Sequence, residues 1–134
     1  HAEIAMAKLK TGFIPNHVGY VYEDICRQKM WELNAQGNLP FLFDRVGRWW
    51  GGKDTEIDIV AIDTTDRSKI IFGECKFHQN VPMQLSELHQ LKEKAAVVPW
   101  GNANRDEYFA LFCISGYSEE LQQLAQEDSH LLLM

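Results

Sequence analysis

Three charged residues within apolar segments are the candidates for a catalytic or metal-binding site. Asp58 lies inside the run Glu56-Ile57-Asp58-Ile59-Val60, and Glu74 and Lys76 close a later apolar segment on either side of Cys75. Side chains alternate along a strand, so Glu74 and Lys76 share one face and Cys75 points to the other. A carboxylate and an ammonium at the end of a covered strand are costly unless each has a partner.

Asp58 is the expected partner of Glu74. If the two segments pair as antiparallel strands across the turn Thr64–Arg67, Asp58 lies opposite Glu74. Two carboxylates this close repel, and they need a proton or a cation between them. A hard divalent cation with oxygen ligands meets that need. Lys76 then stands one pleat along, where it can hold a water or an anionic oxygen.

A purely structural interpretation competes with this one. A Glu-x-Lys on a strand is most often a same-face ion pair, and a single aspartate in a strand is equally unspecific. A functional site is favoured because both patterns occur together on neighbouring strands. They also follow a helix that carries Glu23 at the edge of its apolar stripe. Glu56 shares a face with Asp58 by alternation, unless a bulge turns it away, and it is a secondary candidate.

The elements that must position these residues follow from apolar periodicity and turn signals. The order αβββαβα predicts an α/β fold with a central mixed sheet flanked by helices, in which the fourth strand is parallel to its neighbour. The predicted segments are a helix from Asn16 to about Gln36, strands Leu39–Trp50, Glu56–Asp63 and Lys69–Phe77, a helix from Asn80 and Pro82 to before Pro99, a strand Tyr108–Ile114, and a helix capped by Ser118.

Composition indicates one soluble domain over residues 1–134, with 1–15 as a lead-in segment. The chain is 46% hydrophobic and 24% charged, which is a globular balance. It has no run of about 18 apolar residues that could cross a membrane. Because the first residue is His1, we expect a piece of a longer chain.

The net charge and the cysteine content argue against some classes of protein. The net charge of −6 argues against tight non-specific binding of nucleic acid by this chain alone. Cys26, Cys75 and Cys113 are far apart and odd in number. A disulfide framework or a zinc knuckle is therefore not expected, and a reducing cytoplasm fits best.

One locally basic run suggests how a nucleic acid could be held. Arg45, Arg48 and Lys53 surround Trp49-Trp50. Bases interleaved with aromatic residues suit single-stranded or distorted DNA, through phosphate contacts and stacking. The alternative is that at least one tryptophan packs under the hairpin while the basic side chains are solvated.

The pattern of Glu23, Asp58 and Glu74-Cys75-Lys76, in this element order, resembles the PD-(D/E)xK nuclease superfamily. The phrases Gly19–Glu23, Gly47–Trp50 and Glu56–Val60 are similar to a narrower group within it, the uncharacterised C-terminal domain of archaeal-type P-loop ATPases. The resemblance runs from about residue 16 to about residue 115. The one departure is Ile57, where the superfamily's name has proline.

This resemblance implies a restriction-endonuclease-like core that cleaves DNA phosphodiesters with Mg²⁺ or Mn²⁺. Its implied metal ligands are Asp58, Glu74 and the Cys75 carbonyl, with Glu23 acting through water or supporting a second ion. Lys76 would position the attacking water or stabilise the transition state.

The resemblance also implies partners, namely DNA and an ATPase region. That region is missing here, because no GxxxxGK[ST] motif occurs. A homodimer is a further possible assembly. The alternative function is a nuclease fold that has lost catalysis and serves DNA contact or partner docking.

Overall fold

The computed structural model describes residues 14–52 and 54–134. Lys53 and most of the predicted lead-in segment therefore lie outside the described residues. The elements are α2 (Ile14–Ala35), β1 (Arg45–Gly51), β2 (Thr55–Asp63), β3 (Asp66–Lys76), α3 (Leu85–Ala95), β4 (Asp106–Cys113), α4 (Glu119–Glu127) and β5 (Leu131–Leu133).

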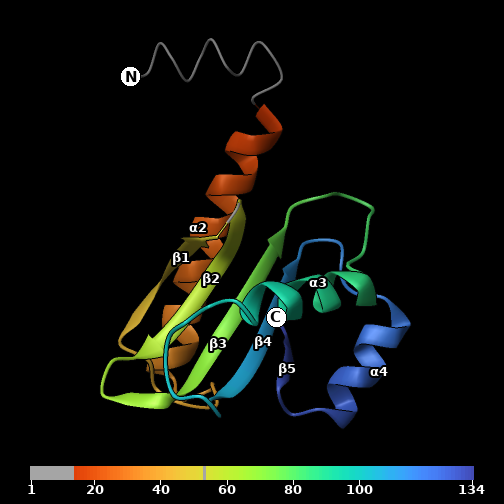
Figure 1. Cartoon of the computed structure of the whole chain (residues 1–134). Helices are drawn as coiled ribbons and strands as arrows, with labels where there is room; N and C mark the ends of the chain where they lie inside the picture. Colours follow the sequence, from red (N-terminus) through yellow and green to blue (C-terminus); the bar gives the residue numbers. More distant parts are fainter. Residues whose placement is uncertain (1–13, 53) are drawn as a thin grey trace, which may run out of the picture.

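These strands form one five-stranded sheet in the order β1-β2-β3-β4-β5 (Figure 1). The first three strands are an antiparallel meander, and β4 lies parallel to β3 after the crossover through α3. The predicted α/β class, the mixed sheet and the parallel fourth strand are confirmed, and the architecture is compatible with a restriction-endonuclease-like core. The short strand β5, parallel to β4, was not predicted.

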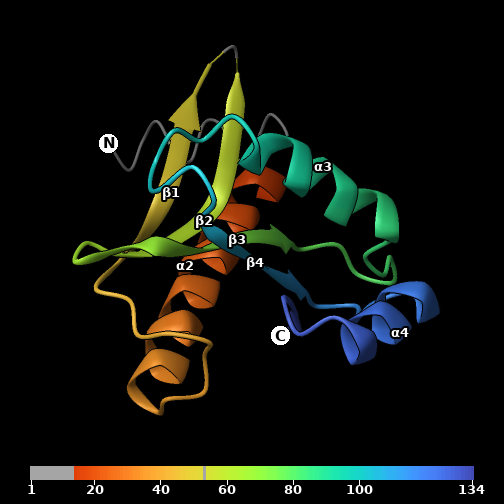
Figure 2. The same cartoon turned by 60° about the horizontal axis from the view of Figure 1, so that its bottom comes forward.

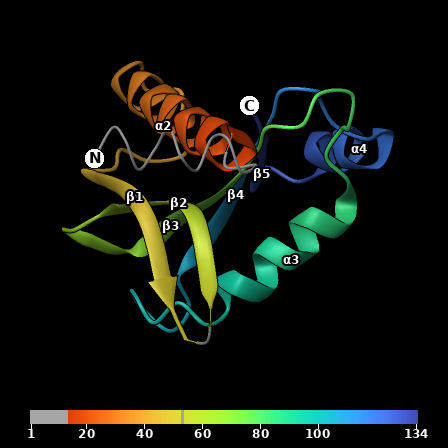
Figure 3. The ribbon, with the colours of Figure 1, turned by 90° about the horizontal axis from the view of Figure 1, so that it is seen from above.

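Helices cover both faces of the sheet. Seen from above, α2 lies on one side of the sheet and α3 on the other (Figure 3). Helix α4 is set apart from α3 (Figure 2) and packs next to β5. The α2 side buries Cys26, Met30, Phe43, Ile59, Ala61, Ile71, Ala110 and Phe112. The α3 side buries a larger set that includes Ile57, Ile70, Phe72, Leu88, Leu91, Leu111 and Leu121. Because apolar residues of β3 face both layers, β3 is the covered central strand that the sequence predicted.

The predicted strand Leu39–Trp50 was wrong in its first half, because β1 begins only at Arg45. The side chain of Asn34 accepts a hydrogen bond from the Phe43 backbone N–H at 2.9 Å and donates one to its carbonyl at 3.0 Å. The Phe43 ring is buried against Trp31. With its backbone groups satisfied by a side chain, Phe43 needs no neighbouring strand.

The helix predicted to open at Asn80 and Pro82 and to stop before Pro99 is shorter at both ends. Met83 forms a bridge with Tyr117, which keeps the chain extended before α3. At the other end, Arg105 donates to the carbonyls of Ala95 at 2.8 Å and Val98 at 2.6 Å. These contacts join the last residue of α3 and the turn after it to Arg105, and the Ala95 carbonyl also accepts the Val98 backbone N–H.

A bulge interrupts β2 beside the candidate site. Gly47 pairs with Val60 and Trp49 with Ile57, so Asp58 and Ile59 together face Arg48. One extra residue reverses the alternation of side chains. Ile57 therefore packs on the α3 side and Ile59 on the α2 side.

We expect Gly73→Ala to destabilise the fold, because a methyl group on Gly73 would lie 2.8 Å from Cβ of the buried Ile59 and 3.3 Å from the Ala110 carbonyl. Overpacking of this kind costs about 1–3 kcal/mol. Gly47→Ala is the matched control, because its Cβ would meet nothing within 4 Å. The free energy of unfolding, measured in denaturant, should fall for the first variant only. Equal stability of both variants would show that the sheet adjusts at Gly73.

Candidate active site

Asp58 and Glu74 meet where the ladder between β2 and β3 ends. The last paired residues are Ile59 and Gly73, so the next residues on the two strands are Asp58 and Glu74. The carboxylate of Asp58 accepts a hydrogen bond at 2.9 Å from the backbone N–H of Cys75. The Asp58 side chain thus accepts the hydrogen bond that a backbone carbonyl of β2 would accept in a regular sheet. This bond holds Asp58 against β3, the strand that carries Glu74 and Lys76.

Burial raises the pKa values of both acids, and the charge of Asp58 adds to the shift of Glu74. Burial, with the nearby Asp58 charge, raises the pKa of Glu74 from its ordinary 4.5 to about 7, although the Lys94 ammonium, 3.9 Å away, opposes the shift. Burial also raises the pKa of Asp58, against the hydrogen bond from Cys75 and the charge of Arg48. A carboxyl pair in this state has a strong electrostatic affinity for a cation.

Arg48 links Glu23 to this pair. Its Nη2 lies 3.1 Å from Glu23 and 3.9 Å from Asp58. Glu23 is only 9% exposed, and its pKa is raised by burial and then by Asp58. Arg27, one turn later on α2, donates at 3.1 Å to the backbone carbonyl of Asp58 and so ties the bulge to the helix. The structure thus places Glu23 beside Asp58, on the α2 side.

Glu56 is turned away from Glu74 by the bulge. Its carboxylate accepts a hydrogen bond at 3.1 Å from Nε1 of Trp50 and lies 3.8 Å from Arg48. The Glu56 side chain is also half exposed. It therefore belongs to the surroundings of Arg48 rather than to the Asp58–Glu74 pair.

Lys76 shares a face with Glu74, as predicted, but its ammonium pairs with Glu87 of α3. The Glu87 carboxylate also accepts the backbone N–H of Gln84 at the start of the helix. Sequence reasoning missed both Glu87 and Lys94. Their spacing along α3, near two full helical turns, is the signal that they share one face.

Cys75 turns its thiol to the α2 side, where it packs with the cluster that contains Cys26. A hydrogen bond with Cys26, together with burial, raises the pKa of the Cys75 thiol. A thiol in that state is a poor nucleophile. Any contribution of Cys75 to the site therefore comes from its backbone N–H and carbonyl.

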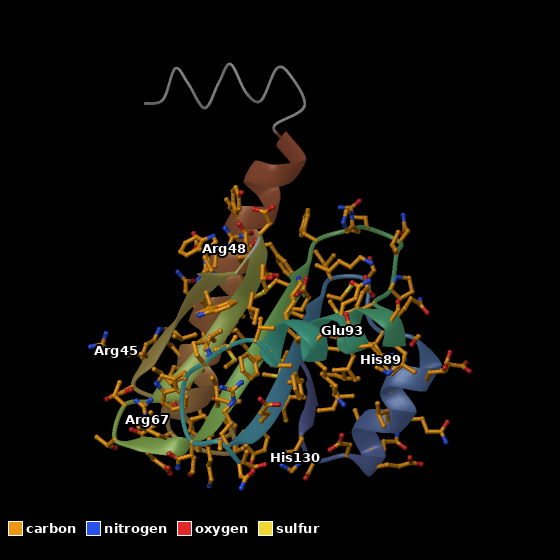
Figure 4. All side chains as sticks on the ribbon, in the orientation of Figure 1. Arg45, Arg48, Arg67, His89, Glu93 and His130 are labelled. Atoms are coloured by element: carbon orange, nitrogen blue, oxygen red, sulfur yellow. The ribbon has the colours of Figure 1, made fainter. Side chains whose placement is uncertain are left out.

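The basic residues of the β1 hairpin do not form one patch. Figure 4 places Arg45 near Arg67, at the end of the sheet far from Arg48. Arg48 is engaged by acids, and Lys53 lies outside the described residues. Of the two adjacent tryptophans, Trp49 packs against the core and Trp50 is 63% exposed.

The donors around Asp58 are those that hard cations prefer. Asp58, Glu74 and Glu23 offer carboxylate oxygens, and Cys75 adds a backbone carbonyl, a set that suits Mg²⁺ or Mn²⁺. Within residues 14–52 and 54–134, no three His, Cys, Asp or Glu side chains are already gathered at metal-binding distances. Arg48 and Lys94, each 3.9 Å from one of these carboxylates, offset part of their charge.

Comparison with known proteins identifies the family. Residues 1–95 match the model of DUF234, described as archaea bacterial proteins of unknown function. The chain belongs to this family. The match includes Glu23, Asp58, Glu74 and Lys76 and ends with α3, so the DUF234 segment contains every acid and cation of the candidate site.

An uncharacterised protein of Methanocaldococcus jannaschii is 30% identical to the chain over 96 residues. The alignment covers 71% of this chain and 21% of that protein, so the chain spans about a fifth of its relative's length. No solved structure matches the chain. Among the described residues, no helix is both long and apolar enough for a membrane crossing.

We expect Glu74→Gln to stabilise the protein above neutral pH. Because the folded-state pKa of Glu74 is raised to about 7, the folded protein holds a proton that the unfolded chain releases near 4.5. The free energy of unfolding therefore falls as pH rises from 4.5 to 7. At higher pH the variant should exceed the parent by about 2–3 kcal/mol, and the gain should vanish below the lower pKa.

Denaturant unfolding across this pH range measures the difference. Glu93→Gln, which changes an exposed acid on α3, is the control and should show no such pH-dependent gain. A Glu74→Gln advantage that persists unchanged in acid would contradict the raised pKa.

Proposed function

We propose that this chain is a metal-dependent deoxyribonuclease domain of the PD-(D/E)xK superfamily, acting on DNA phosphodiester bonds. The observation that carries the proposal is the Asp58 carboxylate bonded to the backbone of Cys75. It joins, at one end of two strands, the residues that match the superfamily's aspartate, glutamate and lysine.

The roles of the residues follow from their charges. Asp58, Glu74 and the Cys75 carbonyl would hold Mg²⁺ or Mn²⁺, with Glu23 as an outer carboxylate. When bound, the ion supplies a Lewis acid for a phosphate oxygen and lowers the pKa of a water. Lys76 holds that water or stabilises charge that builds up on phosphate. Glu87 orients the Lys76 side chain through their ion pair.

Other parts of the proposal concern the longer protein. The chain covers about a fifth of the M. jannaschii protein, which leaves room for the ATPase region that the resemblance implies. We propose that such a region works with this domain on DNA, in the cytoplasm.

A second candidate is a nuclease fold without catalysis that contacts DNA or docks a partner. The observation that favours it is the pairing of the site's cations. Lys76 contacts Glu87, and Arg48 contacts Glu23. In a domain without catalysis these ion pairs would be permanent structural contacts. In a nuclease they must break, or rearrange, when the substrate binds. Metal binding and the Lys76 variants separate the two functions.

Calorimetric titration with Mn²⁺ should show binding to the parent and none to Asp58→Asn. The asparagine oxygen can still accept the Cys75 hydrogen bond, so the fold keeps that contact while the charge is lost. Mg²⁺ should raise the melting temperature of the parent and not of Glu74→Gln, because only a folded site with both carboxylates binds the ion. Glu93→Gln should behave as the parent. Equal heats from parent and Asp58→Asn would rule out this metal site.

Lys76→Ala should keep Mn²⁺ binding and lose DNA cleavage by about 10²–10³, the usual effect of deleting one charge donor to the transition state. Lys76→Arg should not restore full activity, because a planar guanidinium cannot replace a compact ammonium. Lys69→Ala, at the other end of β3, is the control.

If Lys76 serves only as the partner of Glu87, its loss should destabilise the fold by a few kcal/mol. Metal binding would then disappear with the fold. A stable Lys76→Ala protein that binds Mn²⁺ and cuts as fast as the parent would remove Lys76 from both roles.

A further inference from the structure

An arginine lies between two exposed aromatic rings beside the candidate site. The guanidinium carbon of Arg48 is 5.0 Å from the ring centre of Tyr20, on α2, and 5.7 Å from that of Trp50, on β1. Tyr20 is 46% exposed and Trp50 is 63% exposed. Distances of this size are cation–π contacts. The exposed Trp50 ring is therefore in contact with a residue of the candidate site.

The Trp50 ring is held in place without being buried. Its Nε1–H donates to Glu56 at 3.1 Å, and Arg48, which contacts the ring, is itself fixed by Glu23 at 3.1 Å. The adjacent Trp49 packs into the core. Trp31, an exposed tryptophan on α2, instead packs against Phe43 in a tilted arrangement with ring centres 4.7 Å apart. Trp50 thus combines a fixed orientation with an open surface.

We infer that the Trp50 ring is the stacking site for an unpaired base of single-stranded DNA, and this inference rests on the proposed function. A flat aromatic surface recognises the face of a base, and duplex DNA hides these faces within its stack. Arg48 contacts both the Trp50 ring and, at 3.9 Å, the carboxylate of Asp58. A base stacked on Trp50 therefore places its strand next to the acids. The domain would act on single strands or frayed ends.

The charges around the ring indicate stacking rather than phosphate binding. Three carboxylates, from Glu23, Glu56 and Asp58, lie within 4 Å of the Arg48 guanidinium. Arg48 is thus paired with acids, as is Arg27, which lies 3.7 Å from Glu23, so neither guanidinium is free to bind a phosphate. Binding that depends on base faces should show a shallow dependence on salt, whereas phosphate contacts give a steep one.

Fluorescence anisotropy of a labelled oligothymidylate tests the inference, with and without Ca²⁺ to screen the carboxylates. The parent should bind the single strand more tightly than a duplex of equal length. Trp50→Ala should weaken single-strand binding about 5- to 150-fold, the range for losing one stacked base, and should leave duplex binding unchanged. Trp50→Phe should retain most of the affinity, and Trp31→Ala all of it.

The outcomes distinguish stacking from the nuclease proposal. If Trp50→Ala binds the single strand as the parent does, or if it weakens single strand and duplex equally, the inference is wrong even where the parent cleaves DNA. A parent that binds no single strand also overturns it. If Trp50→Ala selectively loses single-strand binding while the parent neither binds Mn²⁺ nor cleaves, the stacking site stands and the nuclease proposal falls.

Discussion

The placement of two carboxylates between β2 and β3 is the constraint on which the rest of the site depends. Neither Asp58 nor Glu74 can be ionised at low cost there, because burial disfavours the charged form of both and the charge of Asp58 also disfavours ionisation of Glu74. Neighbouring elements supply compensation: the backbone N–H of Cys75 from β3, the guanidinium of Arg48 from β1 and the ammonium of Lys94 from α3. Buried acids kept at such cost are typical of functional sites.

The same constraint explains the irregular geometry of β2. A regular ladder would pair the backbone groups of β2 and β3 through this point, and the side chain of Asp58 would stand over one face of the sheet. The bulge opposite Arg48 lets the carboxylate enter the ladder and bond to Cys75. Arg27 then secures the displaced backbone through the Asp58 carbonyl. Bulges next to active sites commonly redirect a side chain in this way.

Helices α2 and α3 are therefore part of the site as well as its support. Glu23 and Arg27 come from α2, on one face of the sheet, and Glu87 and Lys94 come from α3, on the other. Each helix delivers one acid and one cation to the end of the central strands. A substrate that displaces one of these cations would leave an acid unpaired, so ligand binding and the local charge balance are coupled.

The sequence by itself determined the central part of this protein. Apolar periodicity predicted the class and the parallel crossover. The predicted register, which brings Asp58 to Glu74, holds from the pair Ile59–Gly73 to the pair Ile62–Ile70, although the hairpin itself closes at Asp63–Asp66 after a register shift that the sequence did not reveal. The loop before Arg45 and the early stop of α3 escaped prediction, because side chains from other segments, Asn34 and Arg105, bond to their backbone groups. Strand β5 also escaped prediction, because this short segment depends on pairing with β4. Only the tertiary structure decided that Lys76 pairs with Glu87 and that Arg48 faces acids, because these partners come from separate elements whose packing no local pattern encodes.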